Sequence, residues 1–168
     1  MSDYFCELTY QYSGATLVAT CVDCPEVPAV EAVPQQTIID PRNGWNSGAR
    51  SSLMRAGDCY VQFSFTTPLA GSICGLAETF ASTDPSVVDY GIYGLTDGAY
   101  TKFAVIERGE IARAPENIDL STAVFRIERA GSRIHYYANN VRVHSSDLRS
   151  ASSLMVVALL YSADDGIV

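Results

Sequence analysis

The feature that most constrains the fold is a succession of short strand-like segments, with turn residues between them about every eight to twelve positions. Residues 60–66 are rich in aromatic and β-branched side chains, which favour strands, and Pro68 follows them. Residues 69–80 contain two glycines and lack the apolar spacing of three and four that helices require. This pattern predicts an all-β fold built as an antiparallel sandwich or barrel.

A three-strand meander between Val124 and His144 gives the sharpest local prediction. Asn139-Asn140 is a dipeptide that tolerates positive φ at both positions, so it predicts a two-residue hairpin turn. In this register His135 faces His144, and Tyr137 faces Arg142. Alternation then places Ile134, Tyr136, Ala138, Val141 and Val143 on an apolar face, and Arg133, His135, Tyr137, Arg142 and His144 on a polar one. A preceding turn at Ala130-Gly131 would pair Ile127 with Ile134 and Phe125 with Tyr136 on the apolar face, and Glu128 with Arg133 on the polar one.

Composition and charge exclude several classes of protein. The chain is 48% hydrophobic and 18% charged, the balance of an ordered globular protein. Its formal net charge of −8 repels phosphate backbones, which argues against nucleic-acid binding. The longest apolar run, residues 154–161, is too short to cross a bilayer. The first residues are acidic where a secretion signal needs basic ones, so we expect synthesis in a cytoplasm without membrane insertion.

The N-terminal region differs from the rest of the chain in its strand pattern and its proline content. Residues 7–12 and 15–22 look like two short strands around the turn Ser13-Gly14. The stretch CPEVPAVEAVPQQ follows, and its three prolines predict an extended linker. We therefore divide the chain into an attachment arm, residues 1–37, and a β-sandwich domain, residues 38–168. Because two short strands bury too little surface to be stable alone, we expect the arm to dock on a partner rather than on its own domain.

Residues 38–168 resemble a known family. The stretch VFRIERAGSRIHYYANNVRVHSS, followed by SSLMVVALLYSADDGIV, is similar to the closing strands of concanavalin A-like lectin/glucanase jelly rolls. The stretch GWNSGARSSLMRAGDCYVQFSF is similar to the opening of the same module. The resemblance implies an antiparallel β-sandwich of the jelly-roll type. Its last strand would be a short stub at residues 166–168, which leaves an open sheet edge or one that another chain completes.

Jelly rolls joined to a short N-terminal region resemble tail-fibre and baseplate proteins of tailed bacteriophages. This resemblance implies a non-enzymatic structural or adaptor protein of the virion, assembled in the host cytoplasm. Its partners would be other virion tail or baseplate proteins, within a homo-oligomer or a larger assembly. The alternative is a carbohydrate-binding lectin module that recognises a bacterial surface glycan.

The sequence argues against an enzyme. Hydrolytic members of the resembled family carry a Glu-x-Asp-x-x-Glu pattern on one strand, and this chain has no such pattern. Glu107 and Glu110 flank Gly109, which indicates a solvated hairpin tip. No nucleophile elbow and no glycine-rich phosphate loop is present either.

Two places could bind a glycan through aromatic stacking and polar hydrogen bonds. Trp45 and Asn46 lie in the polar, glycine-containing run of residues 43–48, which is either a binding loop or a turn whose tryptophan packs over the end of the sandwich. Tyr137 and Arg142 lie on the polar face of the meander, beside His135.

The cysteines and histidines offer weaker candidates for a metal site. Cys6, Cys21 and Cys24 could hold zinc or an iron–sulfur cluster if a fourth ligand came from elsewhere, and a disulfide or free thiols are the alternatives. Cys59 and Cys74 lie in apolar stretches and are expected to be buried. His135 and His144 could share zinc, but two ligands are too few, so a polar sheet surface is the simpler interpretation. Apart from the N-terminal cysteines, we expect no cofactor.

Overall fold

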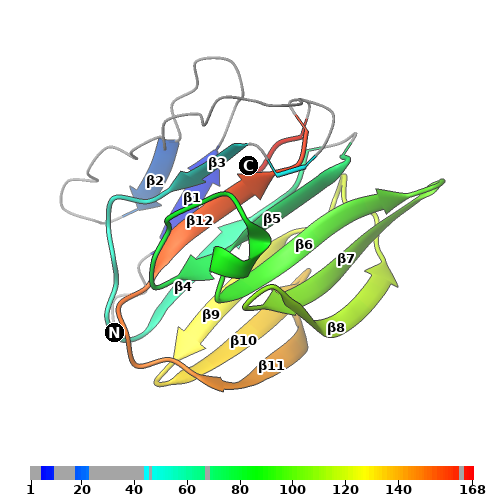
Figure 1. Cartoon of the computed structure of the whole chain (residues 1–168). Coiled ribbons are helices and arrows are strands. Elements are labelled where there is room, and N and C mark those ends of the chain that lie inside the picture. Colours follow the sequence, from blue (N-terminus) through cyan, green and yellow to red (C-terminus); the bar gives the residue numbers. More distant parts are fainter. Residues whose placement is uncertain (1–4, 10–17, 23–43, 46, 67–68, 163–164) are drawn as a thin grey trace.

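The chain forms a two-layer β-sandwich (Figure 1). The computed structural model describes residues 5–9, 18–22, 44–45, 47–66, 69–162 and 165–168, the first two segments through their backbone. Over these residues the strands make two six-stranded sheets, and the short 3-10 helix η1 (Pro85–Val87) is the helical element present. The predicted all-β sandwich is confirmed. Within the described part of the chain, no helix has the length and apolar character needed to cross a membrane.

The first sheet has the strand order β11-β10-β9-β4-β1-β2. Its strands are β1 (Phe5–Thr9), β2 (Val18–Val22), β4 (Cys59–Phe63), β9 (Phe125–Ala130), β10 (Arg133–Ala138) and β11 (Val141–Arg149). The second sheet has the order β3-β12-β5-β6-β7-β8. Its strands are β3 (Ser47–Arg50), β5 (Gly71–Ala77), β6 (Tyr90–Asp97), β7 (Tyr100–Glu107), β8 (Glu110–Asn117) and β12 (Met155–Leu160).

The main core lies between the two sheets. Alternation along β4 and β9 turns Val61, Phe63, Phe125 and Ile127 inward, where they are buried. Phe125 stands at the centre, with its ring centroid 5.5–5.9 Å from those of Phe63, Phe65 and Phe103. Aromatic packing of this kind holds two sheets together strongly, because each ring buries a large apolar area.

The second sheet also has a buried cluster on its outer side, around β5 and β12. Along β5, Cys74 and Leu76 belong to the main core, whereas Ile73 and Ala77 belong to a second apolar cluster on the opposite side of the strand. Trp45 packs against this second cluster, together with Phe80, Val87 and Tyr93. The outer side of the first sheet, by contrast, carries polar residues, and the candidate site lies there.

The β9–β10 hairpin confirms the predicted faces but not the predicted register. It turns at residues 131–132, and Gly131 adopts a φ of 62° that glycine accommodates without strain. Tyr136 therefore pairs with Ile127 rather than with Phe125. Because a shift by two residues preserves the side of each residue, Phe125, Ile127, Ile134 and Tyr136 still point into the core.

The β10–β11 hairpin begins as predicted and then departs from the prediction. Asn139 and Asn140 have φ values of 49° and 64°, and Tyr137 pairs with Arg142. A bulge then adds one residue to β11, so His144 pairs with Tyr136, and His135 pairs with Ser145. The predicted pairing of His135 with His144 is therefore wrong. Val141, predicted on the apolar face, is 65% exposed beside the turn.

The two N-terminal strands lie at one edge of the first sheet. β1 pairs antiparallel with β2, with Cys6 opposite Cys21, and pairs parallel with β4, with Glu7 opposite Gln62. The edge of β4 offers backbone hydrogen-bonding groups that β1 satisfies. The expectation that these strands dock away from their own domain is therefore wrong. The proline-containing stretch and the boundary at residue 37 lie outside the described residues.

The C-terminal residues pair with the segment that follows β4. Ser64 and Val168 exchange two backbone hydrogen bonds of 2.7 and 2.8 Å, and Thr66 donates to Gly166 at 2.9 Å. Asp165, 3% exposed, anchors the turn before this pairing. Its carboxylate accepts hydrogen bonds from the backbone N–H groups of Ala70, Gly71 and Ser162 at 2.6–3.0 Å. The predicted stub is therefore paired within the chain.

Arg129 is a buried cation that the alternation pattern did not single out. It points inward from β9 and is 1% exposed. Its guanidinium donates to three backbone carbonyls, those of Gly57 at 2.5 Å, Arg55 at 2.8 Å and Ser152. One side chain thus joins β9 to the loop before β4 and the loop before β12. Burial raises the pKa of the neighbouring Cys59 thiol, and Arg129 partly opposes that rise.

Candidate functional site

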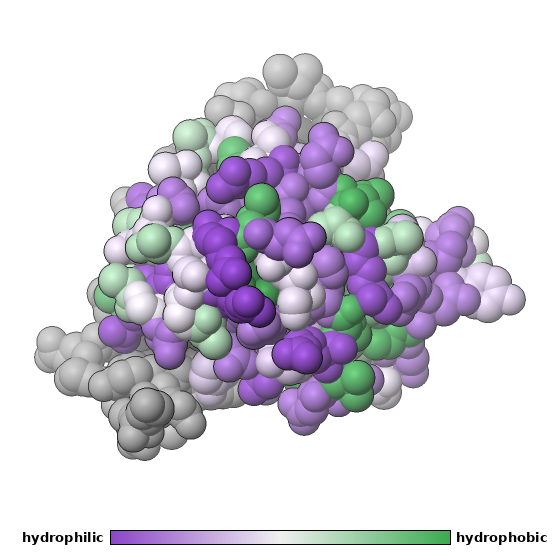
Figure 2. All heavy atoms as spheres, turned by 90° about the horizontal axis from the view of Figure 1, so that it is seen from below, coloured by the Kyte–Doolittle hydropathy of each residue, from purple (hydrophilic) through white to green (hydrophobic). Residues whose placement is uncertain are grey.

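Eight residues form what we call the polar face, on the outer side of the first sheet. They are Tyr60, Gln62, Arg126, Glu128, His135, Tyr137, Arg142 and Ser145. Strand pairing sets them in two parallel rows, Gln62-Arg126-Tyr137-Arg142 and Tyr60-Glu128-His135-Ser145. Seen from below, the side of the molecule on which β9–β11 lie is mostly hydrophilic (Figure 2). The face is open to ligands because its side chains are half-buried or exposed.

Arg126 organises the first row. Its guanidinium carbon lies 4.3 Å from the centroid of the Tyr137 ring and 5.9 Å from that of Tyr60. These distances are those of cation–π contacts. Its Nη2 lies 3.4 Å from Oε2 of Glu128. The Nε atom of Arg126 is buried and has no hydrogen-bond partner among the described residues. Arg126 is thus held in place by aromatic rings and one carboxylate, with a donor left over.

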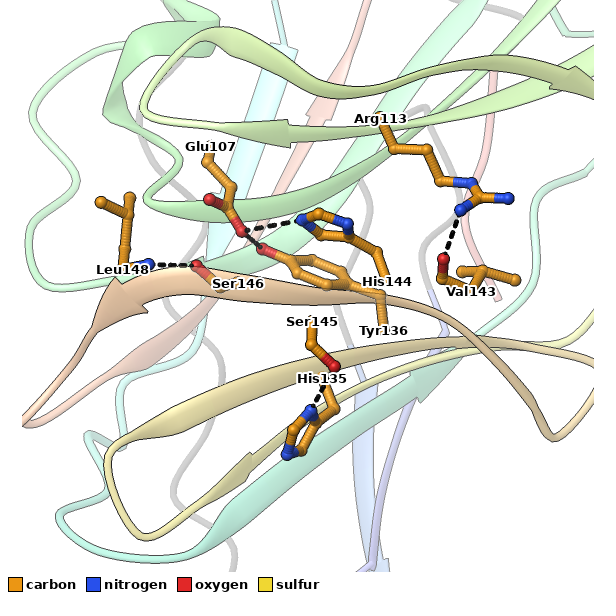
Figure 3. Close-up of polar contacts among 9 residues, drawn as sticks. All are labelled: Glu107, Arg113, His135, Tyr136, Val143, His144, Ser145, Ser146 and Leu148. Carbon is orange, nitrogen blue, oxygen red and sulfur yellow. Dashed lines mark hydrogen bonds and ion pairs between the residues drawn. The ribbon is translucent and has the colours of Figure 1, made fainter.

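The second row adds further hydrogen-bonding groups. Nδ1 of His135 lies 2.8 Å from Oγ of Ser145 across the β10–β11 pair, as Figure 3 shows. Glu128 connects the two rows through Arg126. Together the rows present aromatic rings, guanidinium groups, an amide, a carboxylate and a hydroxyl on one rigid sheet surface.

The structure separates the two predicted glycan-binding places. Tyr137 and Arg142 are cross-strand partners on the polar face. Trp45 stands edge-on to Tyr93 and Tyr161, at 5.6 Å from each ring centroid, against the apolar cluster of the second sheet. This placement fits the alternative that the tryptophan packs over the sandwich. Asn46 lies outside the described residues.

Sequence reasoning missed four members of the polar face: Tyr60, Gln62, Arg126 and Ser145. Alternation with the buried Phe125 and Ile127 is a signal that could have placed Arg126 outward, and the bulge in β11 brings Ser145 opposite His135. Tyr60 and Gln62 join the face because β4 lies beside β9. That pairing joins segments far apart in sequence, and neither segment's local pattern reveals it.

A second polar cluster lies between the sheets (Figure 3). The Tyr136 hydroxyl donates to Oε1 of Glu107 at 2.9 Å, and Nε2 of His144 lies 3.9 Å from the same oxygen. His144 reaches this interior position because of the bulge in β11, whereas His135 points to the other side of the sheet. Burial, and then the nearby Glu107 carboxylate, raise the pKa of Tyr136 well above its usual value.

The interior cluster connects the edges of the two sheets. Glu107 lies at the end of β7, and its carboxylate reaches across the core to β10. Close by, Nη1 of Arg113 on β8 donates to the carbonyl of Val143 on β11, and Arg113 also pairs with Glu116. The side chain of Glu107 is 10% exposed. These contacts give the cluster a structural role in closing this side of the sandwich.

The interior cluster predicts how stability responds to alkaline pH. The pKa of Tyr136 is higher in the folded chain than in the unfolded chain, so its contribution is complete below about pH 10 and is lost as pH rises towards the folded value. We expect the free energy of unfolding to fall above about pH 10, and Tyr136→Phe to make that fall shallower. Urea unfolding between about pH 8 and pH 11 measures it. Tyr100→Phe, at an exposed tyrosine, is the control, and an equally steep fall in Tyr136→Phe would contradict the prediction.

The two predicted metal sites, at the N-terminal cysteines and at the two histidines, have different outcomes. The described residues contain no cluster of three or more His, Cys, Asp or Glu side chains that could hold an ion. Shared zinc between His135 and His144 is excluded, because these residues point to opposite sides of the sheet. Cys6 and Cys21 are opposite each other in the β1–β2 pair, and Cys24 lies outside the described residues. A zinc or iron–sulfur site at the three N-terminal cysteines stays a prediction.

Comparison with known proteins identifies the fold and no sequence family. No protein-family model matches the chain, and no curated protein matches its sequence. Among solved structures, the TRIM65 PSpry domain is 10% identical with a TM-score of 0.51, covering 74% of this chain and 70% of that one. Stonustoxin is 9% identical with a TM-score of 0.54 over 98% of this chain, which spans 28% of the toxin chain. A Bacillus licheniformis β-glucanase is 11% identical with a TM-score of 0.42, over 73% and 67% of the two chains.

The likenesses with TM-scores above 0.5, to the TRIM65 PSpry domain and to stonustoxin, show a shared fold. At 9–10% sequence identity, these likenesses give information on the fold alone. The proteins named above include no phage tail protein. The virion location, the adaptor role and the virion partners therefore stay predictions from sequence.

Proposed function

We propose that the chain is a non-enzymatic carbohydrate-binding module and that the polar face is its binding surface. The observation that supports this most is the row Gln62-Arg126-Tyr137-Arg142 on an open sheet. A sugar ring offers an apolar side that stacks on an aromatic ring and hydroxyls that need directed donors and acceptors. This row places both kinds of partner on neighbouring strands.

The order within the face favours binding. Arg126 is fixed by Tyr137 on one side and by Glu128 at its edge. Side chains that are already ordered lose little entropy when a ligand binds, so more of the interaction energy contributes to affinity. Placement on strands rather than on loops adds to this rigidity.

The face favours binding over hydrolysis. A retaining glycosidase needs two carboxyl groups about 5 Å apart across the scissile bond. Among the eight residues of the polar face, Glu128 is the carboxylate, and it is paired with Arg126. We therefore expect no new reducing ends when the protein is incubated with a glycan that it binds.

A glycan array with matched variants tests the proposal. We expect the wild type to bind a subset of glycans and Tyr137→Ala to lose that binding by about tenfold or more, because the stacking ring is gone. Tyr100→Ala, which removes an exposed tyrosine from β7 on the second sheet, is the matched control and should bind as the wild type does. Circular dichroism checks that both variants are folded. A folded Tyr137→Ala that keeps the wild-type hits, or a wild type without hits, would contradict the proposal.

A further inference from the structure

The outer side of β9–β11 is basic although the chain as a whole is acidic. Four arginines and two carboxylates point outward from these strands, a formal balance of +2, whereas the whole chain carries −8. The residues are Arg126, Arg133, Arg142, Arg149, Glu128 and Asp147. The rest of the chain therefore carries −10, since −8 minus +2 is −10. A local basic surface on an acidic protein attracts a small anionic ligand to that surface.

Two of these arginines flank the aromatic ring of the polar face. Arg126 on β9 and Arg142 on β11 are the Cα partners of Tyr137 on its two sides. Neighbouring strands lie about 4.8 Å apart, so the two arginines are separated by about 10 Å at the backbone. A sugar that stacks at Tyr137 would therefore have a guanidinium on each side.

Both arginines have donors available. The side chain of Arg126 is 30% exposed, so its guanidinium reaches the surface, where Nη2 lies 3.4 Å from Oε2 of Glu128. Arg142 is exposed, and among those residues its guanidinium has no hydrogen-bond or ion-pair partner. A guanidinium offers paired N–H groups whose geometry matches two oxygens of a carboxylate or sulfate, and such charge-assisted bonds are stronger than bonds to a neutral hydroxyl. The chemistry of these donors fits an acidic group better than a neutral one.

A long phosphate polymer fits the molecule poorly. Such a polyanion would extend past the polar face and meet the remaining surface, whose charge of −10 repels it. A sugar unit with one acidic group contacts only the basic surface.

We infer that the glycan bound by the polar face carries a carboxylate or sulfate group, which Arg126 and Arg142 recognise on either side of Tyr137. This inference rests on the proposed function. It names the substrate class and makes the two arginines the residues that determine specificity.

Matched pairs of glycans test the inference. Isothermal titration compares tetragalacturonate with its methyl ester and sialyllactose with lactose, so that each pair differs in its acidic group. The best glycan of the array, with and without its acidic group, completes the set. We expect the acidic member that binds to do so about tenfold or more tightly than its neutral partner, and to weaken as salt rises.

Variants distinguish a specific site from general attraction. Arg142→Gln and Arg126→Gln should each reduce the preference for the acidic member by about tenfold. Arg108→Gln removes the same charge from an exposed arginine that pairs with Asp89, away from the polar face, and should leave the preference unchanged.

Each outcome bears on one of the two proposals. Equal or tighter binding of the neutral members would overturn the inference while the face remains a glycan-binding surface. An acidic preference that survives both Arg142→Gln and Arg126→Gln would also overturn it. A folded protein that binds neither member of any pair and nothing on the array would overturn the proposed function itself.

Discussion

Arg129→Met should lower the free energy of unfolding by about 3 kcal/mol or more. The substitution removes three hydrogen bonds from the charged guanidinium to the carbonyls of Arg55, Gly57 and Ser152, and a hydrogen bond to a charged group contributes about 1.5–3 kcal/mol. Only the Arg55 carbonyl keeps another donor among the described residues, the N–H of Leu154 at 2.9 Å. The loops before β4 and β12 also lose the side chain that joins them to β9. Equilibrium unfolding in urea measures the change.

Two further variants make this result specific. Arg133→Met, at an exposed arginine on the adjacent strand, should change stability by less than about 0.5 kcal/mol. Arg129→Lys keeps the charge but lacks the planar guanidinium, so it should recover only part of the lost free energy of unfolding. This variant provides the measurement if Arg129→Met does not fold. Unfolding of Arg129→Met at the wild-type urea concentration would contradict the structural role of this residue.

Gly75→Ala should cost about 3 kcal/mol or more, because the neighbouring strand leaves no room for a side chain. A Cβ at this position would lie 2.2 Å from the carbonyl oxygen of Tyr90 and 2.8 Å from Cα of Gly91, so the backbone of β5 and β6 would have to separate. Forcing atoms into a packed core typically costs about 1–3 kcal/mol, and backbone displacement costs more than a change in side-chain rotamer. Thermal and urea unfolding measure the change.

Gly71→Ala on the same strand is the matched comparison. There the added Cβ would meet side-chain atoms of Tyr93 at 3.3 Å, and a side chain can move by a few tenths of an ångström. We expect its cost to be well below that of Gly75→Ala. Equal stability of the two variants would show that the close approach of β5 and β6 does not restrict residue 75.

The fold was predictable from sequence because its signals are local and repeated. Alternation of apolar and polar residues identified the strands of the meander, and the turn at Asn139-Asn140 fixed the pairing of Tyr137 with Arg142. That pairing is half of the first row of the candidate site. The family resemblance added the expectation of a two-layer sandwich, and the strands do form two six-stranded sheets.

The departures from prediction have physical causes that local patterns do not show. The bulge in β11 adds one residue without any turn signal, and it moves His144 into the interior. Arg129 is an inward-pointing charge that only carbonyls from distant loops can satisfy. Trp45 lies in a polar stretch, yet its contacts with Tyr93 and Tyr161 are tertiary ones.

The asymmetry of the two sheets explains why the polar face is the candidate surface. The outer side of the second sheet around β5 and β12 is apolar, and Trp45, Phe80 and Val87 pack against it. The outer side of β4, β9, β10 and β11 instead carries arginines, tyrosines and hydrogen-bonding groups. A rigid sandwich with one outer side covered and the other polar is suited to present the latter to a ligand.

Amide chemical-shift mapping with the best-bound glycan of the array locates the binding surface on the molecule. The chain has a single tryptophan, so the indole N–H signal of Trp45 reports on the second sheet while the backbone amides of β4, β9, β10 and β11 report on the first. We expect the largest shift changes on those four strands and an indole signal that stays in place, because the ligand binds the polar face. Largest changes at Trp45 and its neighbours Tyr93 and Tyr161, with β9–β11 unaffected, would contradict it.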